Sequence, residues 1–300
     1  MGSRFDITIV AKDIPTAEKY IDSSVIEISR IENLISDWIP ESQLSQVNKN
    51  AGIQPIKVDQ ELIELTERAI HFSEMTNGAF DISFAAADRI WKFDGSMSEM
   101  PSPEKVKESV KKIGYKNIII NREDSTIFLK LPGMKIGFGA TGKGYAADKT
   151  KELMISKGVT AGIINASGDM NTWGKQPDGS NWIIGVTNPM ENTEVFALFE
   201  LSGTGVVTSG NYEKYVIIDK KRYSHIIDPR TGYPSSGLSS VTVFGESAEK
   251  ANGISTAIMV LGKKEGLKLL NQNRDLQGII IDDKGKRFYS KKFNIKKHRN

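Results

Sequence analysis

Gly137-Phe-Gly-Ala-Thr-Gly-Lys-Gly-Tyr-Ala-Ala-Asp148 is a glycine-rich stretch that joins an apolar segment to a helical one. The preceding residues 134–138 predict a β-strand, and a helix is expected from about Gly144 to Lys157. A strand that passes through glycine into a helix offers backbone N–H groups and the positive end of the helix dipole. With Lys143 as an added positive charge, the loop predicts a phosphate site.

The same loop nearly fits the P-loop pattern G-x-x-x-x-G-K-[ST], and Gly278-Ile-Ile-Ile-Asp282 could serve as its Walker B strand. Position 144 is glycine, so the hydroxyl that holds Mg²⁺ in a P-loop is missing. A P-loop NTPase is therefore only a minor alternative.

Most of the remaining chain consists of short β-branched segments separated by turn residues. Strands are expected at 4–12, 117–121, 125–131, 161–165, 182–187, 195–201, 205–208, 214–219, 222–227, 238–244, 278–282 and 286–290. Helices are expected at 15–35, 60–76, 248–261 and 264–271, a polar loop at 36–55, and a hairpin turn at Pro132-Gly133. Antiparallel strands outnumber βαβ units, so the fold class is α+β.

The composition is that of a folded protein. Of 300 residues, 39% are hydrophobic and 8% aromatic, which excludes a disordered chain and allows one large domain or two interleaved lobes. Cysteine is absent, which removes disulfides, thiolate nucleophiles and thiolate metal ligands. No apolar run reaches the roughly 18 residues of a membrane span. Residues 1–13 show no signal-peptide pattern, so we expect a cytoplasmic protein or one whose leader has been removed.

The charge is unevenly distributed. Residues 284–300 contain eight Lys or Arg and no acidic residue, which leaves 32 basic against 37 acidic side chains elsewhere. A basic tail can contact an anionic membrane or nucleic acid, but a solvated terminal extension is the simpler interpretation. The mildly acidic body argues against nucleic-acid binding as the main function. We take 1–283 as one domain and 284–300 as a basic C-terminal strand and tail.

Two further segments place single titratable groups at the ends of strands. Asp169 closes Asn165-Ala-Ser-Gly-Asp169, where it can bind a hydroxyl, a base or a metal, or form an Asx turn. His225 precedes the strong turn Asp228-Pro-Arg-Thr-Gly232 and lies beside other polar groups, where a base near neutral pH is useful. Taken alone, His225 is as easily explained by structural hydrogen bonding. The other histidines, at positions 71 and 298, lie in a helix and in the basic tail.

Asn252 and Thr256 are four residues apart and so lie on one helix face, where both carry oxygen atoms. Such a face can hold a hard cation such as Mg²⁺. Helix capping is the default explanation for these two residues.

Several segments form an ordered set: Met1-Gly2-Ser3, Ser36-Asp-Trp38, Ser42-Gln-Leu-Ser-Gln-Val-Asn48, Gly78-Ala-Phe-Asp81, Gly142-Lys-Gly-Tyr-Ala-Ala-Asp148, Asn165-Ala-Ser-Gly-Asp169, Thr208-Ser-Gly-Asn-Tyr212, His225-Ile-Ile-Asp-Pro-Arg-Thr-Gly232 and Ala251-Asn-Gly-Ile-Ser-Thr256. The set resembles the ApbE family, the FAD:protein FMN transferases once labelled thiamine biosynthesis lipoproteins. The resemblance runs from residue 1 to about residue 262. It implies an α+β fold of mostly antiparallel sheets with packed helices, and FAD in a cleft between two lobes.

The resemblance also implies a set of site residues. FAD would contact Met1, Trp38, Ala79, Phe80, Asp81, Gly137, Ile226 and Thr231, and its phosphates would meet Lys143. The ligands of Mg²⁺ would be the Ala140 carbonyl, Asn252, and Ser255 or Thr256. His225 is the expected proton acceptor, with Asp169 second.

In the family, Mg²⁺ bridges the FAD pyrophosphate while a Ser or Thr of a flavoprotein subunit attacks the FMN phosphorus and AMP leaves. The acceptors implied are subunits of membrane redox complexes. The location implied is the periplasm or the outer face of the cytoplasmic membrane, as a lipoprotein. The lipid-bearing cysteine is absent here, so that location depends on the resemblance and on a removed leader.

Two positions depart from the family pattern, because the family usually has Asp where this chain has Asn252 and Gly137. A neutral amide can still bind Mg²⁺, but with one negative charge fewer. Two alternatives to the transferase therefore remain, namely an FAD pyrophosphatase that releases FMN and AMP, and a catalytically weak FAD-binding protein.

Overall fold

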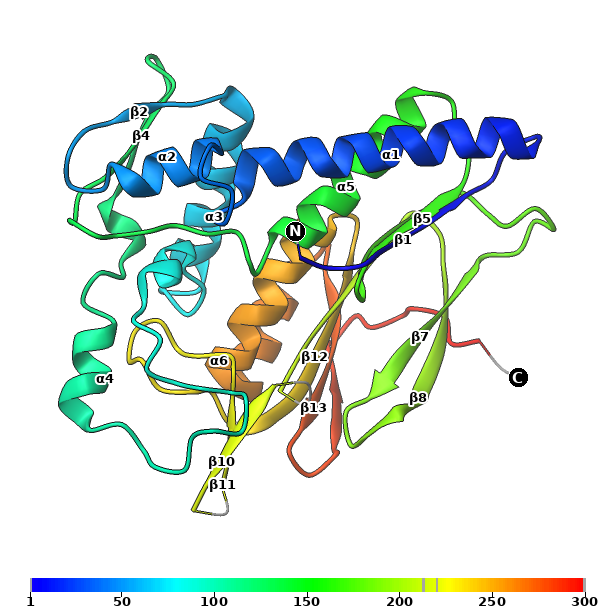
Figure 1. Ribbon diagram of the computed structural model, residues 1–300. Helices are drawn as coiled ribbons and strands as arrows, with labels where there is room; N and C mark the ends of the chain where they lie inside the picture. The colour runs from blue at the N-terminus through cyan, green and yellow to red at the C-terminus, as the bar shows by residue number, and fades with distance from the viewer. Residues whose placement is uncertain (1, 212–213, 220, 299–300) are drawn as a thin grey trace. The chain divides into compact units, whose positions relative to one another are not determined.

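The computed structural model describes residues 2–211, 214–219 and 221–298 (Figure 1). The helices are α1 (Ile14–Ile35), α2 (Gln43–Lys49), α3 (Gln60–Met75), α4 (Pro103–Ser109), α5 (Gly142–Ser156) and α6 (Ala248–Gln272), with 3₁₀ turns η1 (Ile82–Ala86) and η2 (Tyr115–Asn117). The strands are β1 (Phe5–Ile9), β2 (Ile56–Lys57), β3 (Ile118–Asn121), β4 (Thr126–Leu129), β5 (Gly162–Ala166), β6 (Asp169–Trp173), β7 (Trp182–Asn188), β8 (Glu191–Leu201), β9 (Gly205–Gly210), β10 (Tyr215–Ile218), β11 (Lys221–Ser224), β12 (Leu238–Gly245), β13 (Gln277–Asp282) and β14 (Arg287–Tyr289).

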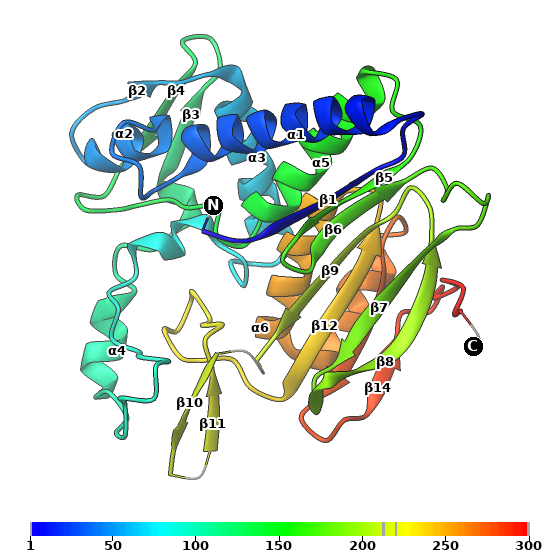
Figure 2. The ribbon, with the colours of Figure 1, turned by 45° about the vertical axis from the view of Figure 1, so that its right-hand side comes forward.

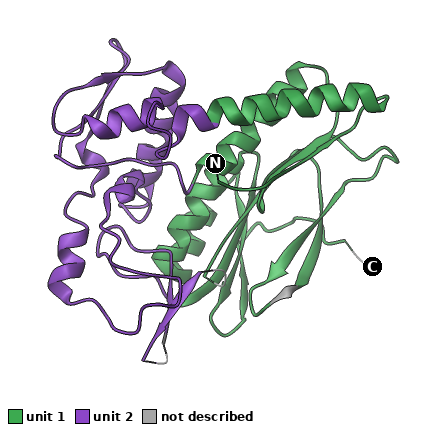
Figure 3. Cartoon of the chain, in the orientation of Figure 1, with its two compact units in different colours: residues 1–31, 141–212, 237–300 green, residues 32–140, 213–236 purple. Residues whose placement is uncertain are grey.

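The chain divides into two compact units (Figure 3). Unit 1 comprises residues 1–31, 141–212 and 237–300, and unit 2 comprises residues 32–140 and 213–236. Unit 1 contains a seven-stranded sheet in the order β1-β5-β6-β9-β12-β13-β14, and all of its strand pairs are antiparallel. Helices combined with antiparallel sheets confirm the α+β class predicted from the sequence.

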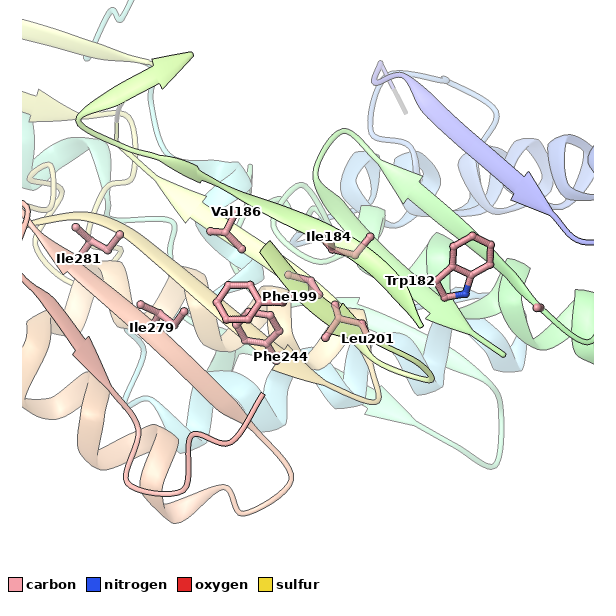
Figure 4. Close-up of a cluster of buried hydrophobic side chains, with 10 residues drawn as sticks. Trp182, Ile184, Val186, Phe199, Leu201, Phe244, Ile279 and Ile281 are labelled. Carbon is pink, nitrogen blue, oxygen red and sulfur yellow. The ribbon is translucent and has the colours of Figure 1, made fainter. Parts of the chain in front are cut away.

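The sheet of unit 1 is covered on both faces. Helices α5 and α6 pack on one face, as Figure 2 shows, and the two-stranded β7–β8 sheet packs on the other. Every residue of β12 is buried as a result, because its side chains point alternately into the two layers. On the β7–β8 side the core is aromatic, and Phe199 lies edge-on to Phe244 with ring centroids 5.2 Å apart (Figure 4).

Helices α5 and α6 approach each other unusually closely at Gly144. A Cβ atom at this position would lie 2.4 Å from the carbonyl oxygen of Ala248, so only glycine allows the contact. One turn further along α5, the Asp148 carboxylate accepts hydrogen bonds from the backbone N–H groups of Ala248 and Glu249 and from the Ser247 hydroxyl. Burial raises the pKa of Asp148, and these donors oppose the rise. Two residues of the glycine-rich motif thus fix where α6 begins.

Unit 2 is built around α3 and the small β2-β4-β3 sheet. A second cluster joins Trp91 and Val106 to Val216 and Ile218 of β10. The indole N–H of Trp91 donates to the Gly232 carbonyl at 2.8 Å, which ties the turn after His225 to this cluster.

The strand predicted at 134–138 is wrong. The turn predicted at Pro132-Gly133 is present, since the Met134 N–H donates to the Leu131 carbonyl at 3.0 Å, but it joins no pair of strands among the described residues. Residues 134–138 are extended but pair with no strand among the described residues. The side chain of Asn48 takes the place of a neighbouring strand, since its amide donates to the Ile136 carbonyl at 2.9 Å and its oxygen accepts from the Ile136 N–H at 2.8 Å. The true hairpin of this region joins β3 to β4.

Two α-helices and two strands were not predicted. Helix α2 lies within the expected polar loop; the Ser42 hydroxyl caps it, and only Leu44 and Val47 of its side chains are buried. Helix α4 and strands β2 and β6 are also additional. By contrast, the predicted break between two C-terminal helices is confirmed, because Gly262 has a φ of 77° inside α6.

The basic C-terminal segment is folded onto unit 1 and is not a solvated extension. Phe293 packs against Phe199 and Phe244 with ring centroids 6.1 and 5.8 Å apart. Lys296 pairs with Glu200 at 2.6 Å. In the described part of the chain, no helix combines the length and apolar composition that a membrane crossing requires.

We expect Gly144→Ala to lower the free energy of unfolding by roughly 2–4 kcal/mol, because the added methyl group meets the Ala248 backbone in a close-packed contact. Urea unfolding followed by tryptophan fluorescence measures the loss. Gly139→Ala is the control, since a Cβ there has no heavy atom within 4 Å and the change should stay within about 0.5 kcal/mol. Equal losses in the two variants would contradict the proposed role of Gly144.

Candidate functional site

The glycine-rich loop leads into the N-terminus of α5, as the sequence predicted. The helix begins at Gly142, and its first turn carries no acidic side chain. Thr141 at the N-cap makes no capping bond through its side chain, and its buried Oγ1 has no hydrogen-bond partner among the described residues. The first N–H groups of α5 and an unsatisfied hydroxyl are therefore available to an anionic ligand.

Lys143 and Asp169 form an ion pair within unit 1. The Nζ atom of Lys143 lies 2.5 Å from Oδ2 of Asp169. Asp169 is almost fully buried at the start of β6, whereas the side chain of Lys143 is 29% exposed. The two residues that the sequence assigned to phosphate binding and to proton transfer thus neutralise each other.

The first turns of α6 present a set of neutral oxygen atoms. Asn252 is buried, and its Oδ1 accepts no hydrogen bond from any described residue. The Ser255 hydroxyl is hydrogen-bonded to the Ser209 hydroxyl at 2.8 Å and donates to the Asn252 carbonyl at 3.0 Å. The Thr256 hydroxyl lies 3.4 Å from the same Ser209 oxygen. Ser209 belongs to the Thr208-Ser-Gly motif, but no sequence pattern predicted that it would lie beside α6.

These atoms fit a hard cation better than a soft one. Amide and hydroxyl oxygens are ligands that Mg²⁺ accepts, and the unpaired Asn252 oxygen is a buried acceptor that a cation would satisfy. The described residues hold no cluster of three or more His, Cys, Asp or Glu side chains suited to a metal. Because these protein oxygens are neutral, a cation bound here would need negative charge from a bound substrate, such as the phosphates of a nucleotide.

In unit 2, the loop after α3 is fixed from within. Asn77 and Gly78 have φ angles of 49° and 74°, the left-handed geometry that ends the helix. Ala79 and Phe80 are buried, and Phe80 packs edge-on against Phe72. These residues line the interior of unit 2.

Asp81 has a structural role that the sequence did not reveal. Its Oδ1 accepts from the Ser83 N–H at 2.8 Å and hydroxyl at 2.6 Å, and its Oδ2 accepts from the Tyr115 N–H at 2.8 Å. Burial is the largest influence on this carboxyl and raises its pKa. Asp81 therefore fixes η1 and the start of η2.

Trp38 belongs to the Ser36-Asp-Trp38 turn of unit 2, and Gly137 lies close to Asp37 of the same turn. Trp38 is 74% exposed, and the Arg89 guanidinium lies 5.4 Å from the centre of its ring. Nothing in the local sequence marks Arg89. A Cβ at Gly137 would lie 3.0 Å from the Ala85 Cβ and 3.9 Å from Oδ2 of Asp37, so a side chain here would be tight against Ala85.

His225 lies at the foot of the β10–β11 ribbon, where its backbone N–H and its Nδ1 both point to the Lys214 carbonyl, at 3.1 and 3.0 Å. A carbonyl only accepts, so Nδ1 carries the proton and the lone pair of the neutral ring is on Nε2. Phe93 packs edge-on to the imidazole, with ring centroids 6.4 Å apart. This arrangement orients a ring whose Nε2 can accept a proton.

The turn that follows is rigid. Asp228 accepts from Nε and Nη2 of Arg230 at 2.9 and 2.8 Å, and this pairing raises the pKa of the guanidinium. Gly232 has a φ of 78°, and a Cβ there would lie 2.9 Å from Val106. Ile226 accepts from the Ser235 N–H through its carbonyl, and the Thr231 hydroxyl accepts from the Tyr233 N–H. Both predicted contact residues are thus part of a fixed loop.

The predicted site residues fall into both units. Unit 1 contains Lys143, Asp169, Asn252, Ser255 and Thr256, and unit 2 contains Trp38, Ala79, Phe80, Asp81, Gly137, Ala140, His225, Ile226 and Thr231. Within unit 1, Lys143 contacts Asp169, and hydrogen bonds link Ser209 to Ser255 and Thr256 and Ser255 to the Asn252 backbone. Met1, predicted to flank FAD, lies outside the described residues.

Comparison with known proteins gives consistent matches over almost the whole chain. The model of the ApbE family matches residues 1–280. A FAD:protein FMN transferase of Klebsiella pneumoniae is 29% identical over 283 residues, with 94% of this chain and 86% of the relative covered. The FAD:protein FMN transferase of Treponema pallidum is 30% identical, with coverages of 83% and 73%.

Solved structures agree with these relatives. The ApbE protein of Thermotoga maritima superposes with a TM-score of 0.87 at 30% identity, covering 97% of this chain and 95% of that one. The apo form of the flavinyl transferase ApbE from Pseudomonas stutzeri gives a TM-score of 0.85 at 28% identity, with coverages of 97% and 92%. The fold described above is therefore shared along its full length.

We expect Asp81→Asn to lower the free energy of unfolding at neutral pH by about 1–3 kcal/mol, because the new NH₂ group leaves a buried N–H or hydroxyl without an acceptor. The loss should grow as the pH falls. The folded-state pKa of Asp81 is raised, so protonation stabilises the wild type as the pH drops through that pKa, and this contribution is complete below the unfolded value.

The matched control is Asp94→Asn. Asp94 makes the same bonds to the N–H and hydroxyl of the serine two residues later, but it is exposed, and those bonds lower its pKa. The loss of unfolding free energy caused by Asp94→Asn should therefore shrink as the pH falls, because protonation of Asp94 removes the stabilisation that its carboxylate gives the wild type. Urea unfolding from pH 7 to pH 4 compares the variants; slopes of the same sign would refute the assignment.

Proposed function

This chain belongs to the ApbE family, and we propose that it transfers FMN from FAD to a serine or threonine hydroxyl of an acceptor protein, with release of AMP. The acceptor oxygen forms a bond to the FMN phosphorus, the bond from that phosphorus to the AMP oxygen breaks, and the acceptor proton passes to a protein base. The similarity to named FAD:protein FMN transferases supports the reaction class.

The observation that carries the proposal is the orientation of His225. Its Nδ1–H is held by the Lys214 carbonyl, so the neutral ring presents Nε2 as the basic nitrogen. A base held in one tautomer needs no rearrangement before it accepts a proton. The buried and ion-paired Asp169 is the weaker candidate, because its carboxylate is already neutralised by Lys143.

Lys143 is the proposed contact for the FAD pyrophosphate. It lies in the first turn of α5, where helix N–H groups and a positive dipole also favour an anion. Because it pairs with Asp169 at 2.5 Å, phosphate binding would exchange one anionic partner for another. Asp169 thus keeps a cation oriented before the substrate arrives.

Mg²⁺ is the proposed metal, held by the Ala140 carbonyl, Asn252, and Ser255 or Thr256. When bound, it would neutralise charge on the pyrophosphate. The unsatisfied Asn252 oxygen supports this assignment. The Ser255 hydroxyl is held in place beside it, since it is hydrogen-bonded both to Ser209 and to the backbone carbonyl of Asn252.

The flavin and adenine are proposed to contact Trp38, Ala79, Phe80, Asp81, Gly137, Ile226 and Thr231, together with Met1. Trp38 supports a stacking role, because an exposed indole beside a guanidinium has a face that a planar ring can cover. The acceptor is proposed to be a flavoprotein subunit of a membrane redox complex, reached in the periplasm or at the outer face of the cytoplasmic membrane.

The first test is AMP release from FAD and Mg²⁺, with and without an acceptor polypeptide. We expect AMP and covalent flavin to appear together and only with the acceptor. AMP without acceptor would favour the pyrophosphatase, and FAD binding without AMP would favour a binding protein.

His225→Gln should lower turnover by about 10²–10⁴-fold, as loss of a general base does. His71→Gln, an exposed change on α3, should leave turnover unaltered.

Asn252→Asp should raise Mg²⁺ affinity by about tenfold, since an ionised oxygen replaces a neutral one in a buried position. In EDTA the variant should melt below the wild type because the added charge is buried, and Mg²⁺ should produce the larger increase in melting temperature in the variant. Differential scanning calorimetry with a Mg²⁺ titration measures both. Asn188→Asp, at a turn where the oxygen accepts from the Met190 N–H, is the control and should show neither effect.

A further inference from the structure

Strand β6 presents two polar side chains to helix α5. Asp169 and Asn171 are two residues apart on the strand, so they lie on the same face of the sheet, and both are buried. Each meets a lysine of α5: Asp169 pairs with Lys143, and the Oδ1 atom of Asn171 accepts from Nζ of Lys151 at 2.9 Å. Two ties therefore join α5 to β6, the second about two helical turns beyond the first.

The second tie continues to the start of α6. The Nδ2 atom of Asn171 donates to Oδ1 of Asp148 at 2.6 Å and to the Glu246 carbonyl at 2.9 Å. The same Asp148 carboxylate accepts from the Ser247 hydroxyl and from the first N–H groups of α6. One amide thus links the Lys151 ammonium to the carboxylate that fixes where α6 begins.

Donor and acceptor roles leave this link a single arrangement. An ammonium only donates, and an ionised carboxylate and a carbonyl only accept, so the amide must turn its oxygen to Lys151 and its NH₂ group to Asp148. Burial lowers the pKa of Lys151, and the charges of Asp148, Glu246 and Glu152 act in the opposite direction. The ammonium and the Asp148 carboxylate therefore offset part of each other's cost of burial.

The two ties differ in how a bound phosphate would affect them. An anion at the N-terminus of α5 competes with Asp169 for Lys143, so the first tie is exchanged when a phosphate binds. Lys151 lies eight residues further along α5, roughly 12 Å away at the rise of an α-helix, beyond the reach of the same phosphate. The second tie therefore stays in place while the first is exchanged.

We propose that Lys151 is a positioning residue for the FAD pyrophosphate and its cation. Through Asn171 and Asp148 it holds the start of α5 and the start of α6 in place while Lys143 exchanges partners. This inference rests on the proposed function and adds a residue that touches neither the substrate nor the metal. Removal of outer partners of this kind changes ligand affinity by about 10–100-fold.

The first test compares Lys151→Met with Lys149→Met. Methionine keeps most of the side-chain length and removes the charge. Lys149 is the matched control, because it lies on the same helix but pairs with the exposed Glu152 at 2.8 Å. Isothermal titration calorimetry with FAD in the presence of Mg²⁺ should show about tenfold weaker binding in Lys151→Met and a change within about twofold in Lys149→Met.

Asn171→Asp gives a readout that a merely structural role would not produce. When the new carboxyl is ionised, it faces the Asp148 carboxylate and FAD affinity should be lost. Burial and the charge of Asp148 hold the pKa of the new carboxyl above its usual range, and once protonated it donates to Asp148 as the amide does. FAD affinity should therefore rise about tenfold between about pH 8.5 and pH 6, whereas Asn171→Leu, which cannot donate, should stay weak throughout.

Equal FAD affinity in the two lysine variants, or an affinity of Asn171→Asp that does not change with pH, would overturn the positioning role. Circular dichroism checks that each variant is folded, and where one is not, the other decides. Weak FAD binding in Lys151→Met, together with a wild type that binds FAD but forms neither AMP nor covalent flavin, would refute the transferase and leave the positioning role intact. Covalent flavin with equal FAD affinity in every variant would do the reverse, and a wild type that binds no FAD would overturn both.

Discussion

The contact between the start of α5 and the start of α6 is the constraint on which unit 1 depends. Gly144 lets the two backbones meet where any side chain would collide with the Ala248 carbonyl. Asp148 then receives the N–H groups of Ala248 and Glu249, and the Ser247 hydroxyl that donates to it also caps α6 through the Lys250 N–H. Helix α6 thus begins at a point that α5 determines.

The functional consequence is positional. Lys143 immediately precedes Gly144, and Asn252 lies one helical turn after Ala248, so the two α5–α6 contacts place both residues relative to each other within unit 1. Burial makes the Asp148 carboxyl costly to ionise, as its raised pKa indicates. The hydrogen-bond donors at the N-terminus of α6 offset part of this cost. The largely buried Asp148 thus anchors the start of α6, whereas Lys143, whose side chain is more exposed, pairs with Asp169.

The helices and strands predicted correctly from the sequence are those that a local pattern of apolar and turn residues determines. Strands with alternating or continuous apolar residues, such as β5 and β12, were located to within a residue or two, and the break at Gly262 followed from glycine alone. The segment 134–138 was misassigned because its partner is a side chain, Asn48, distant in sequence, which no local pattern encodes. Helix α2 was missed because two buried residues give too little periodicity.

The same distinction applies to the candidate site. The glycine-rich loop and the 252/256 helix face could be proposed from spacing, whereas the roles of Asp81 and Ser209 could not. The role of Asp81 depends on its bond from the Tyr115 N–H, and the role of Ser209 depends on its bonds with hydroxyls on α6. In each case the partner is distant in the sequence. Family resemblance supplied the set of residues, but which of them hold the fold and which remain for chemistry is visible only in the hydrogen bonds.

Those hydrogen bonds bear on the choice of base. Four carboxylates of the motifs are engaged: Asp81 with Ser83 and Tyr115, Asp148 with α6, Asp169 with Lys143, and Asp228 with Arg230. Transfer of a proton to any of them would weaken a contact that the fold or the cation requires. The bond from His225 Nδ1–H to the Lys214 carbonyl is kept when Nε2 takes up a proton. Protonation would also create a positive charge as negative charge develops on the phosphates, so a neutral imidazole would stabilise the transition state as well as accept the proton.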